Sequence, residues 1–207
     1  MSRGRFISLE GGEGAGKSTQ ARRLADALDA QGIHAVVTRE PGGSEGAEAI
    51  RRLLMTGAVT RWSAHAEALL FAAARADHVE KLIGPALDAG SWIICDRFID
   101  STRAYQGAQG IDDAAILALH GFGSKGLLPD RTLVLDIGPD EGAARAAVRD
   151  GAGADRFAAR GPDFHAAVAE AFRAMAVREP DRVRLIDAAG SAEAVTVRLV
   201  DALADML

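Results

Sequence analysis

A glycine-rich segment near the start of the 207-residue chain is suited to holding phosphate. Residues 11–18 read GGEGAGKS, which is the P-loop spacing of glycines followed by lysine and serine. The glycines let consecutive backbone N–H groups turn toward phosphate oxygens, and the helix expected after them directs its positive end to the same place. Lys17 would add a charge for the β- and γ-phosphates, and Ser18 a hydroxyl for Mg²⁺. The segment therefore predicts a nucleoside triphosphate site.

A second polar pair follows an apolar run further along the chain. The run at 92–95 ends in Asp96 and Arg97. The carboxyl ends of parallel strands are where open α/β sheets bind ligands, so we expect this pair beside the glycine-rich segment. An arginine there cannot activate water, but its planar, permanently charged fork can bridge two phosphates. This favours transfer to an acceptor that already carries a phosphate, which needs positioning and charge neutralisation rather than a strong base.

Composition narrows the class of protein. The chain contains no asparagine, so it lacks the Asn-Lys-x-Asp motif with which switch GTPases read guanine. Its net charge of −5 argues against a general nucleic-acid binder. A single cysteine, Cys95, excludes a disulfide framework and a cysteine-rich zinc site. No run approaches 18 apolar residues, and the run at 6–9 is too short for a signal peptide, so we expect a cytoplasmic protein that spans no membrane.

The elements that must position these residues follow from the alternation along the chain. Short apolar runs alternate with longer helical stretches, which predicts a parallel sheet with helices on both faces in a single domain, residues 1–207. Strands are expected at 6–9, 35–38, 92–95, 132–137 and 183–186. Helices are expected near 17–31, 44–55, 64–89, 112–122, 141–149, 163–178 and 191–206.

The segment 149–162 breaks this alternation. It is rich in glycine, alanine and arginine and has weak periodicity. Its position alone is typical of an exposed loop between two helices. The phosphate chemistry favours a mobile lid that closes over a substrate, and we carry the lid forward as the prediction.

Taken together, the motifs resemble the thymidylate kinase family over nearly the whole chain. The matching segments are 10–19, 38–43, 70–71 with Arg75, 96–107 and 128–136, followed by Arg149 and the pair 155–156 in the family's lid. The resemblance implies a P-loop NTPase, an α/β fold with a doubly wound sheet of five parallel strands in the order 2-3-1-4-5. It also implies the reaction of ATP with dTMP to give ADP and dTDP, with Mg²⁺ as cofactor.

Two alternatives stay open at this point. The nearer one is a related P-loop kinase that acts on another nucleoside monophosphate or on a deoxynucleoside. The other, from a different class, is a nucleotide-dependent binder or switch with slow hydrolysis, against which the absent guanine motif and Asp96-Arg97 both count. The family resemblance also implies a homodimer, with the helices near 64–89 and 112–122 as candidates for its interface.

The resemblance assigns residues to each substrate. ATP would be bound by Gly11, Gly12, Glu13, Gly14, Ala15, Gly16, Lys17, Ser18, Thr19 and Arg145, and Mg²⁺ by Ser18 and, through water, by Asp96. The acceptor dTMP would contact Glu13, Pro41, Phe71, Arg75, Arg97, Ser101, Thr102, Tyr105 and Gln106. Phe71 would stack on thymine, although the sequence alone favours a core role for it. Tyr105 would crowd the sugar 2′ position or serve as a packing residue.

The catalytic residues implied by the resemblance are Lys17, Arg97, Arg149, Arg156 and Glu13. The P-loop has no arginine between Gly12 and Lys17, so the chain resembles the bacterial type, in which the lid supplies the arginine that stabilises the transition state. Arg145 would stack on adenine, and Arg160 is expected at the surface. Ala158 departs from the glutamate that the family often has at this position.

Overall fold

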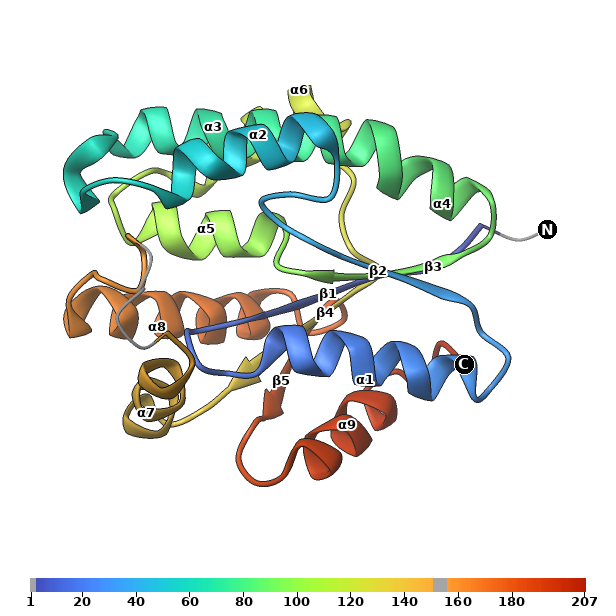
Figure 1. Cartoon of the computed structure of the whole chain (residues 1–207). Coiled ribbons are helices and arrows are strands. Elements are labelled where there is room, and N and C mark those ends of the chain that lie inside the picture. Colours follow the sequence, from blue (N-terminus) through green and yellow to red (C-terminus); the bar gives the residue numbers. More distant parts are fainter. Residues whose placement is uncertain (1–2, 151–155) are drawn as a thin grey trace.

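A parallel sheet forms the centre of the chain, which the computed structural model describes at residues 3–150 and 156–207. The strands are β1 (Phe6–Gly11), β2 (Ala35–Arg39), β3 (Trp92–Asp96), β4 (Arg131–Asp136) and β5 (Val183–Asp187). Their order is β2-β3-β1-β4-β5 and all neighbouring pairs are parallel, which confirms the fold that the resemblance implied (Figure 1). Each predicted strand is present, and its ends lie within two residues of the prediction.

Helices connect the strands and cover both faces of the sheet. They are α1 (Lys17–Asp29), α2 (Glu45–Met55), α3 (Ala64–His78), α4 (Gly84–Asp88), α5 (Ile99–Gly107), α6 (Asp113–Ser124), α7 (Pro139–Asp150), α8 (Pro162–Arg178) and α9 (Ala192–Asp201), with short turns η1 (Val59–Arg61) and η2 (Val79–Ile83). Serine side chains cap α2, α3 and α9 by accepting a backbone N–H three residues on. Among the described helices, none is long and apolar enough to cross a membrane.

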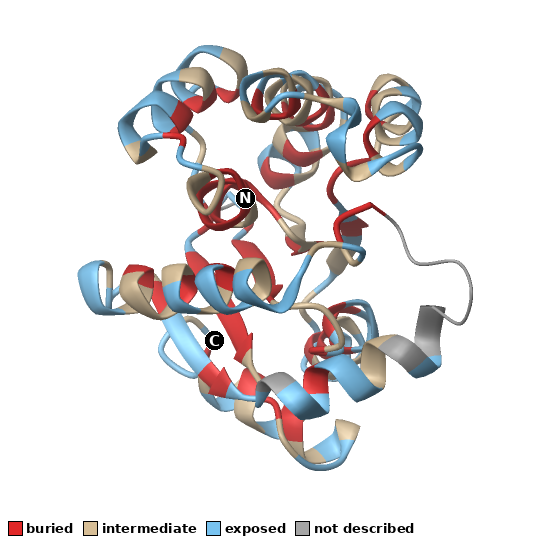
Figure 2. Ribbon diagram, turned by 90° about the vertical axis from the view of Figure 1, so that its left-hand side faces the viewer, coloured by how far each residue is buried: buried red, intermediate tan, exposed pale blue. Residues whose placement is uncertain are grey.

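Two layers of apolar side chains hold the helices to the sheet. On one face, α1 and α9 pack on inward residues of β1, β3, β4 and β5, such as Leu9 and Leu133. On the other face, α3, α4, α5, α6 and α8 pack on the remaining residues, such as Phe6 and Val134. Figure 2 shows the buried residues concentrated on the central strands and on the helix faces turned toward them. Strand β1, which leads into the P-loop, is buried along its whole length.

The structure differs from the predicted helices in three places. The helix expected at 64–89 is divided into α3, the π turn η2 and α4. The helix expected at 191–206 ends at Asp201. Helix α5 was not predicted, because nearly all its residues are buried and its many polar side chains show no apolar stripe. This last difference matters most, since α5 begins two residues after Arg97.

Candidate active site

The P-loop leaves β1 at Gly11 and enters α1 at Lys17, as predicted. Gly14 has a φ of +71°, and a Cβ there would lie 2.0 Å from the carbonyl oxygen of Gly142 on α7, so only glycine fits. Lys17 is buried, and its Nζ donates to the carbonyls of Gly11, at 3.2 Å, and Gly12, at 2.6 Å. Burial and the nearby Arg97 lower the pKa of Lys17 to about 8. The negative charge of a bound polyphosphate would offset the free-energy cost of burying the charged Lys17.

Ser18 and Asp96 meet at the junction of α1 and β3. The hydroxyl of Ser18 donates to Oδ2 of Asp96, and both residues line the same cavity. Mg²⁺ prefers oxygen ligands and is often held by one or two protein groups together with substrate phosphates and water. The described residues include no group of three or more His, Cys, Asp or Glu side chains that would form a complete metal cage. The Ser18 hydroxyl and the Asp96 carboxylate therefore fit a Mg²⁺ site that the nucleotide completes.

Arg97 occupies a left-handed backbone conformation, with a φ of +71°, which is uncommon for a residue other than glycine. Its Nη1 donates to Gly11 O and to Ser101 Oγ, both at 3.2 Å, and its Nη2 donates to Glu13 Oε1 at 2.8 Å. Its guanidinium also lies over the ring of Tyr105, 5.0 Å from the centroid. Arg97 thus joins the P-loop to α5.

Arg75 lies at the far end of the same region and is buried. Its Nε donates to Glu40 Oε2 at 2.8 Å, and its Nη2 donates to Thr102 Oγ1 at 2.9 Å. Glu40 is fixed in turn by His78, whose Nδ1 lies 3.2 Å from Glu40 Oε1, while His78 Nε2 lies 2.8 Å from Thr38 Oγ1. A row of polar side chains from β2, α3 and α5 therefore sets the position of the Arg75 guanidinium.

Aromatic rings surround the space next to Arg75. Phe71 is half-buried on α3, and its ring lies 5.7 Å from that of Phe157. Tyr105 is buried against Phe157 and Phe164, with its hydroxyl 3.4 Å from Glu13 Oε1. Burial raises the pKa of Tyr105 to about 12, so the phenol is neutral. Phe71 therefore lies at the edge of the core rather than inside it, and it lines the cavity described next.

One cavity of about 960 Å³ connects these groups. The predicted residues that line it are Glu13, Gly14, Ala15, Gly16, Lys17, Ser18, Thr19, Pro41, Phe71, Arg75, Asp96, Arg97, Ser101, Thr102, Tyr105, Gln106 and Arg145. Gly11 and Gly12 supply carbonyl oxygens to Lys17 just beside it. Arg145 reaches the cavity from α7, where it pairs with Glu141 and donates to the carbonyl of Ala188 at 3.3 Å. The cavity has room for two substrates in contact.

The structure does not bring Arg156 to this cavity. Arg156 is buried, and its Nη1 pairs with the buried carboxylate of Glu67 at 2.8 Å. The same guanidinium donates to the carbonyls of Leu54, Ala58 and Val59. A buried carboxylate needs a counter-charge, and Arg156 supplies it. In the predicted lid, Arg149 ends α7 together with Asp150, and residues 151–155, including Asp155, lie outside the described residues.

The prediction that Arg160 lies at the surface is wrong. Its Nη2 donates to Glu67 Oε1 at 3.3 Å, and its guanidinium lies 4.5 Å from the ring centroid of Phe164 and 5.5 Å from that of Phe157. Glu67 attracts both arginines to the same buried point. In the described part of the lid, residues 156–162, Arg156 and Arg160 therefore fasten the chain to α3, while Ala159, Gly161 and Pro162 are exposed.

Comparisons with known proteins identify the family. The family model for thymidylate kinase matches residues 9–198. The thymidylate kinase of Rhizorhabdus wittichii is 60% identical over 205 residues, covering 99% of both chains. That of Caulobacter vibrioides is 51% identical over 210 residues, covering 100% of this chain and 99% of the other. The chain belongs to the thymidylate kinase family. A crystal structure of the thymidylate kinase from Ehrlichia chaffeensis, 31% identical, covers 97% of this chain and 99% of its own with a TM-score of 0.79.

Membership of the thymidylate kinase family makes the chain an ATP-dependent nucleoside monophosphate kinase with a P-loop fold. The structure adds cavity residues that the sequence analysis missed, among them Arg39, Glu40, Arg51, Met55 and Phe157. Arg51 on α2 donates to the carbonyl of Pro41 at 2.7 Å. Glu40 and Arg39 lie inside the 38–43 motif, so that motif was the available signal. Arg51, Met55 and Phe157 belong to no motif, and only the folded chain brings them to the cavity.

Proposed function

We propose that the chain transfers the γ-phosphoryl group of ATP to dTMP, giving ADP and dTDP. The observation that carries this is the continuity of one cavity from the P-loop to Phe71 and Arg75. Arg97 contacts both ends, because it donates to the P-loop carbonyl of Gly11 and to Ser101 on α5. A triphosphate at one end and a nucleoside monophosphate at the other would meet at this guanidinium.

The donor end is organised by the P-loop. Backbone N–H groups and the start of α1 would receive the phosphates, and Lys17 would move from the carbonyls of Gly11 and Gly12 to the β- and γ-phosphate oxygens. The negative phosphates favour the charged form of Lys17, so its lowered pKa does not prevent it from binding as a cation. Ser18 would hold Mg²⁺ directly and Asp96 would orient it through water, and Mg²⁺ when bound neutralises phosphate charge.

The acceptor end is organised by α3 and α5. The described contacts of Arg75 use Nε and Nη2, and among the described residues Nη1 makes no hydrogen bond. Nη1 is therefore the donor available for a carbonyl of thymine. Phe71 would stack on the base, worth about 1–3 kcal/mol by analogy with other base–aromatic contacts. Glu13, paired with Arg97 and close to the Tyr105 hydroxyl, would lie near the sugar and the acceptor phosphate.

The reaction needs no strong general base, because the acceptor phosphate is already ionised. Arg97 would bridge the transferring and accepting phosphates bidentately and offset their repulsion. For the lid arginine that stabilises the transition state we propose Arg149. It lies four residues after Arg145 on α7, the helix that already brings Arg145 to the cavity. Arg156 retains the predicted catalytic role only if it leaves Glu67.

An acceptor panel tests the proposal. ADP release is measured with ATP, Mg²⁺ and each of dTMP, dUMP, dCMP, dGMP, UMP, CMP, AMP and thymidine, with Lys17→Ala as the inactive control. We expect strong stimulation by dTMP, weaker stimulation by dUMP and little by the others, because one buried methyl group is worth about 1–3 kcal/mol. Preference for another acceptor would contradict the proposed thymine pocket, while the assignment of the phosphate-binding residues would still hold. ADP release that no acceptor stimulates would contradict the proposed transfer of phosphate to an acceptor.

We further propose that the chain is a homodimer that pairs through α3 and α6. These two helices pack together and carry large exposed apolar side chains on the same side of the sheet. Phe122 is 93% exposed, Leu69 56% and Leu117 36%. Large apolar side chains exposed on two neighbouring helices are expected on a surface that another protein covers.

A further inference from the structure

The first turn of α5 is the part of the fold on which the acceptor end depends. Arg97 lies two residues before the start of this helix, and Ser101, Thr102, Tyr105 and Gln106 lie on it. Since Arg97 holds a left-handed φ of +71°, the chain around it must be fixed by other contacts. Two fully buried acidic side chains, Glu10 and Asp100, supply them.

Glu10 fastens this turn to β1. It comes from the strand that leads into the P-loop, and its Oε1 accepts a hydrogen bond from the backbone N–H of Phe98 at 2.7 Å. Its Oε2 is hydrogen-bonded to Ser101 Oγ, the same atom that accepts from Arg97 Nη1. The backbone N–H of Arg97 itself donates to the carbonyl of Leu9, at 2.9 Å. Residues 9 and 10 thus hold Arg97 on both sides of its peptide unit.

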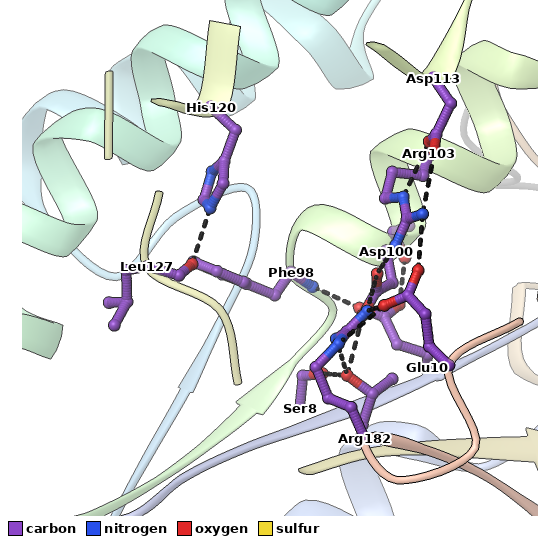
Figure 3. Close-up of polar contacts among 12 residues, drawn as sticks. Ser8, Glu10, Phe98, Asp100, Arg103, Asp113, His120, Leu127 and Arg182 are labelled. Atoms are coloured by element: carbon purple, nitrogen blue, oxygen red, sulfur yellow. Dashed lines mark hydrogen bonds and ion pairs between the residues drawn. The ribbon is translucent and has the colours of Figure 1, made fainter. Parts of the chain in front are cut away.

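Asp100 fastens the same turn to the other half of the sheet. Arg182, from the turn before β5, donates to Asp100 through two bonds of 2.7 and 2.9 Å. Thr132 on β4 adds a hydroxyl at 2.8 Å, and Arg103 adds Nη1 at 3.0 Å. Figure 3 shows Arg182 and Arg103 converging on Asp100, with Glu10 beside them and its bond to Phe98. Every oxygen of this buried carboxylate is therefore satisfied by groups from three separate elements.

Neither carboxyl group lines the cavity. Both are tied to the site through the segment between Arg97 and Ser101, which contains Asp100 and the two groups that bond to Glu10. Displacements of about 1 Å in a catalytic group can cost about 10²-fold in rate, so the fixing of this turn has a direct bearing on transfer.

We propose that Glu10 and Asp100 are positioning residues that clamp the first turn of α5 and thereby hold the Arg97 guanidinium between donor and acceptor phosphates. This inference rests on the proposed role of Arg97. It distinguishes these two acids from Asp113, which pairs with the same Arg103 but lies half-exposed at the start of α6. Burial, with Asp100 nearby, raises the pKa of Glu10 to about 8, which favours the protonated carboxyl at pH 7. A glutamine amide has nearly the same shape and keeps an acceptor oxygen for the backbone N–H of Phe98.

The test compares Glu10→Ala, Glu10→Gln and Asp100→Asn with the matched control Asp113→Asn. All are assayed below their melting temperatures with whichever monophosphate the wild type uses best. We expect Glu10→Ala to lower kcat by about 10²-fold and to change the KM for ATP by less than about threefold. Glu10→Gln should restore most of kcat, and Asp113→Asn should match the wild type. Asp100→Asn should lower kcat, and if it does not fold, the Glu10 series decides.

A double-mutant cycle separates positioning from general stability. In an Arg97→Ala background, Glu10→Ala should cause no further loss of kcat, because the guanidinium that Glu10 positions is absent. The inactive Lys17→Ala variant gives the background rate that is subtracted from each measurement. Losses that multiply, or a Glu10→Gln variant as impaired as Glu10→Ala, would overturn the clamp. If the enzyme prefers an acceptor other than dTMP, the proposed function is contradicted. The test of the clamp remains valid in that case, because the assay uses the acceptor that the enzyme prefers.

Discussion

The hydroxyl of Ser18 is hydrogen-bonded to the carboxylate of Asp96, although 78 residues separate them. Ser18 follows the P-loop lysine on α1, and Asp96 is the last residue of β3. They meet because β1 and β3 are adjacent and parallel, so the P-loop and the end of β3 share one edge of the sheet. This contact places the two oxygen-bearing side chains proposed to serve Mg²⁺ beside the phosphate loop and leads to the first prediction.

Asp96→Asn is expected to weaken the response to Mg²⁺. Removing the charge of a carboxylate that orients a metal costs about 10- to 100-fold in metal affinity or activity. The concentration of Mg²⁺ needed for half-maximal kcat should rise, and this is measured by titrating Mg²⁺ at fixed ATP and acceptor. An unchanged Mg²⁺ dependence would show that Asp96 does not serve the metal.

Phe71→Ala is expected to raise the KM for dTMP by roughly 5- to 150-fold, the equivalent of about 1–3 kcal/mol of lost stacking. The KM for ATP should stay unchanged, because Phe71 lies on α3 away from the P-loop. Phe164→Ala is the matched control, since its ring packs on Tyr105 in the same aromatic cluster without lining the cavity. A lower melting temperature of Phe71→Ala with an unchanged KM for dTMP would show that Phe71 only packs in the core and does not stack on the base.

Arg149→Ala and Arg156→Ala are expected to have different effects. Arg156→Ala leaves Glu67 buried with one arginine fewer, and breaking a buried pair costs about 3–5 kcal/mol, so the melting temperature should fall. Arg149→Ala should lower kcat by orders of magnitude, because it removes the cation proposed to stabilise the transition state. Steady-state kinetics and thermal unfolding on both variants decide. A large loss of kcat in Arg156→Ala at an unchanged melting temperature would restore its predicted catalytic role.

The sequence predicts the location of those site residues that lie within short motifs. The P-loop lies within eight residues, and Asp96-Arg97 follows a buried strand, so parallel-sheet geometry alone brings them together. Phe71 and Arg75 are one helical turn apart on α3, which also makes their shared location predictable.

The parts that it does not predict depend on partners far apart in the chain. Glu67 and Arg156 are 89 residues apart, and no local pattern indicates that a lid arginine will neutralise a carboxylate on α3. Glu40 is paired with Arg75 and His78 in the same long-range way. Helix α5 escaped prediction because its polar residues are buried by specific partners, such as Arg182 on Asp100, rather than facing solvent.

Phe122→Asp is expected to convert a dimer into a monomer, because it places a charge on the proposed interface, where Phe122 is an exposed apolar side chain of α6. Molar mass in solution is measured by light scattering after size-exclusion chromatography. Val177→Asp is the control, since Val177 is also exposed but lies on α8. A wild-type protein that is already monomeric, or a Phe122→Asp variant that stays dimeric, would contradict this interface.

Glu10 should make the stability of the fold depend on pH with a defined sign. Burial, with Asp100 nearby, raises the pKa of Glu10 from 4.5 to about 8. Between these values the folded protein keeps a proton that the unfolded chain has lost. The contribution of Glu10 to the free energy of unfolding is therefore fully present below pH 4.5 and is lost as the pH rises to about 8.

Glu10→Gln does not titrate, so its free energy of unfolding minus that of the wild type should rise across this range. Urea unfolding of both proteins between about pH 5 and pH 8 measures the difference, which should exceed about 1 kcal/mol. The exposed Glu193→Gln serves as the control, because the pKa of Glu193 is lowered by local hydrogen bonds and its titration is complete below this range. A difference that stays flat with pH would contradict the raised pKa of Glu10.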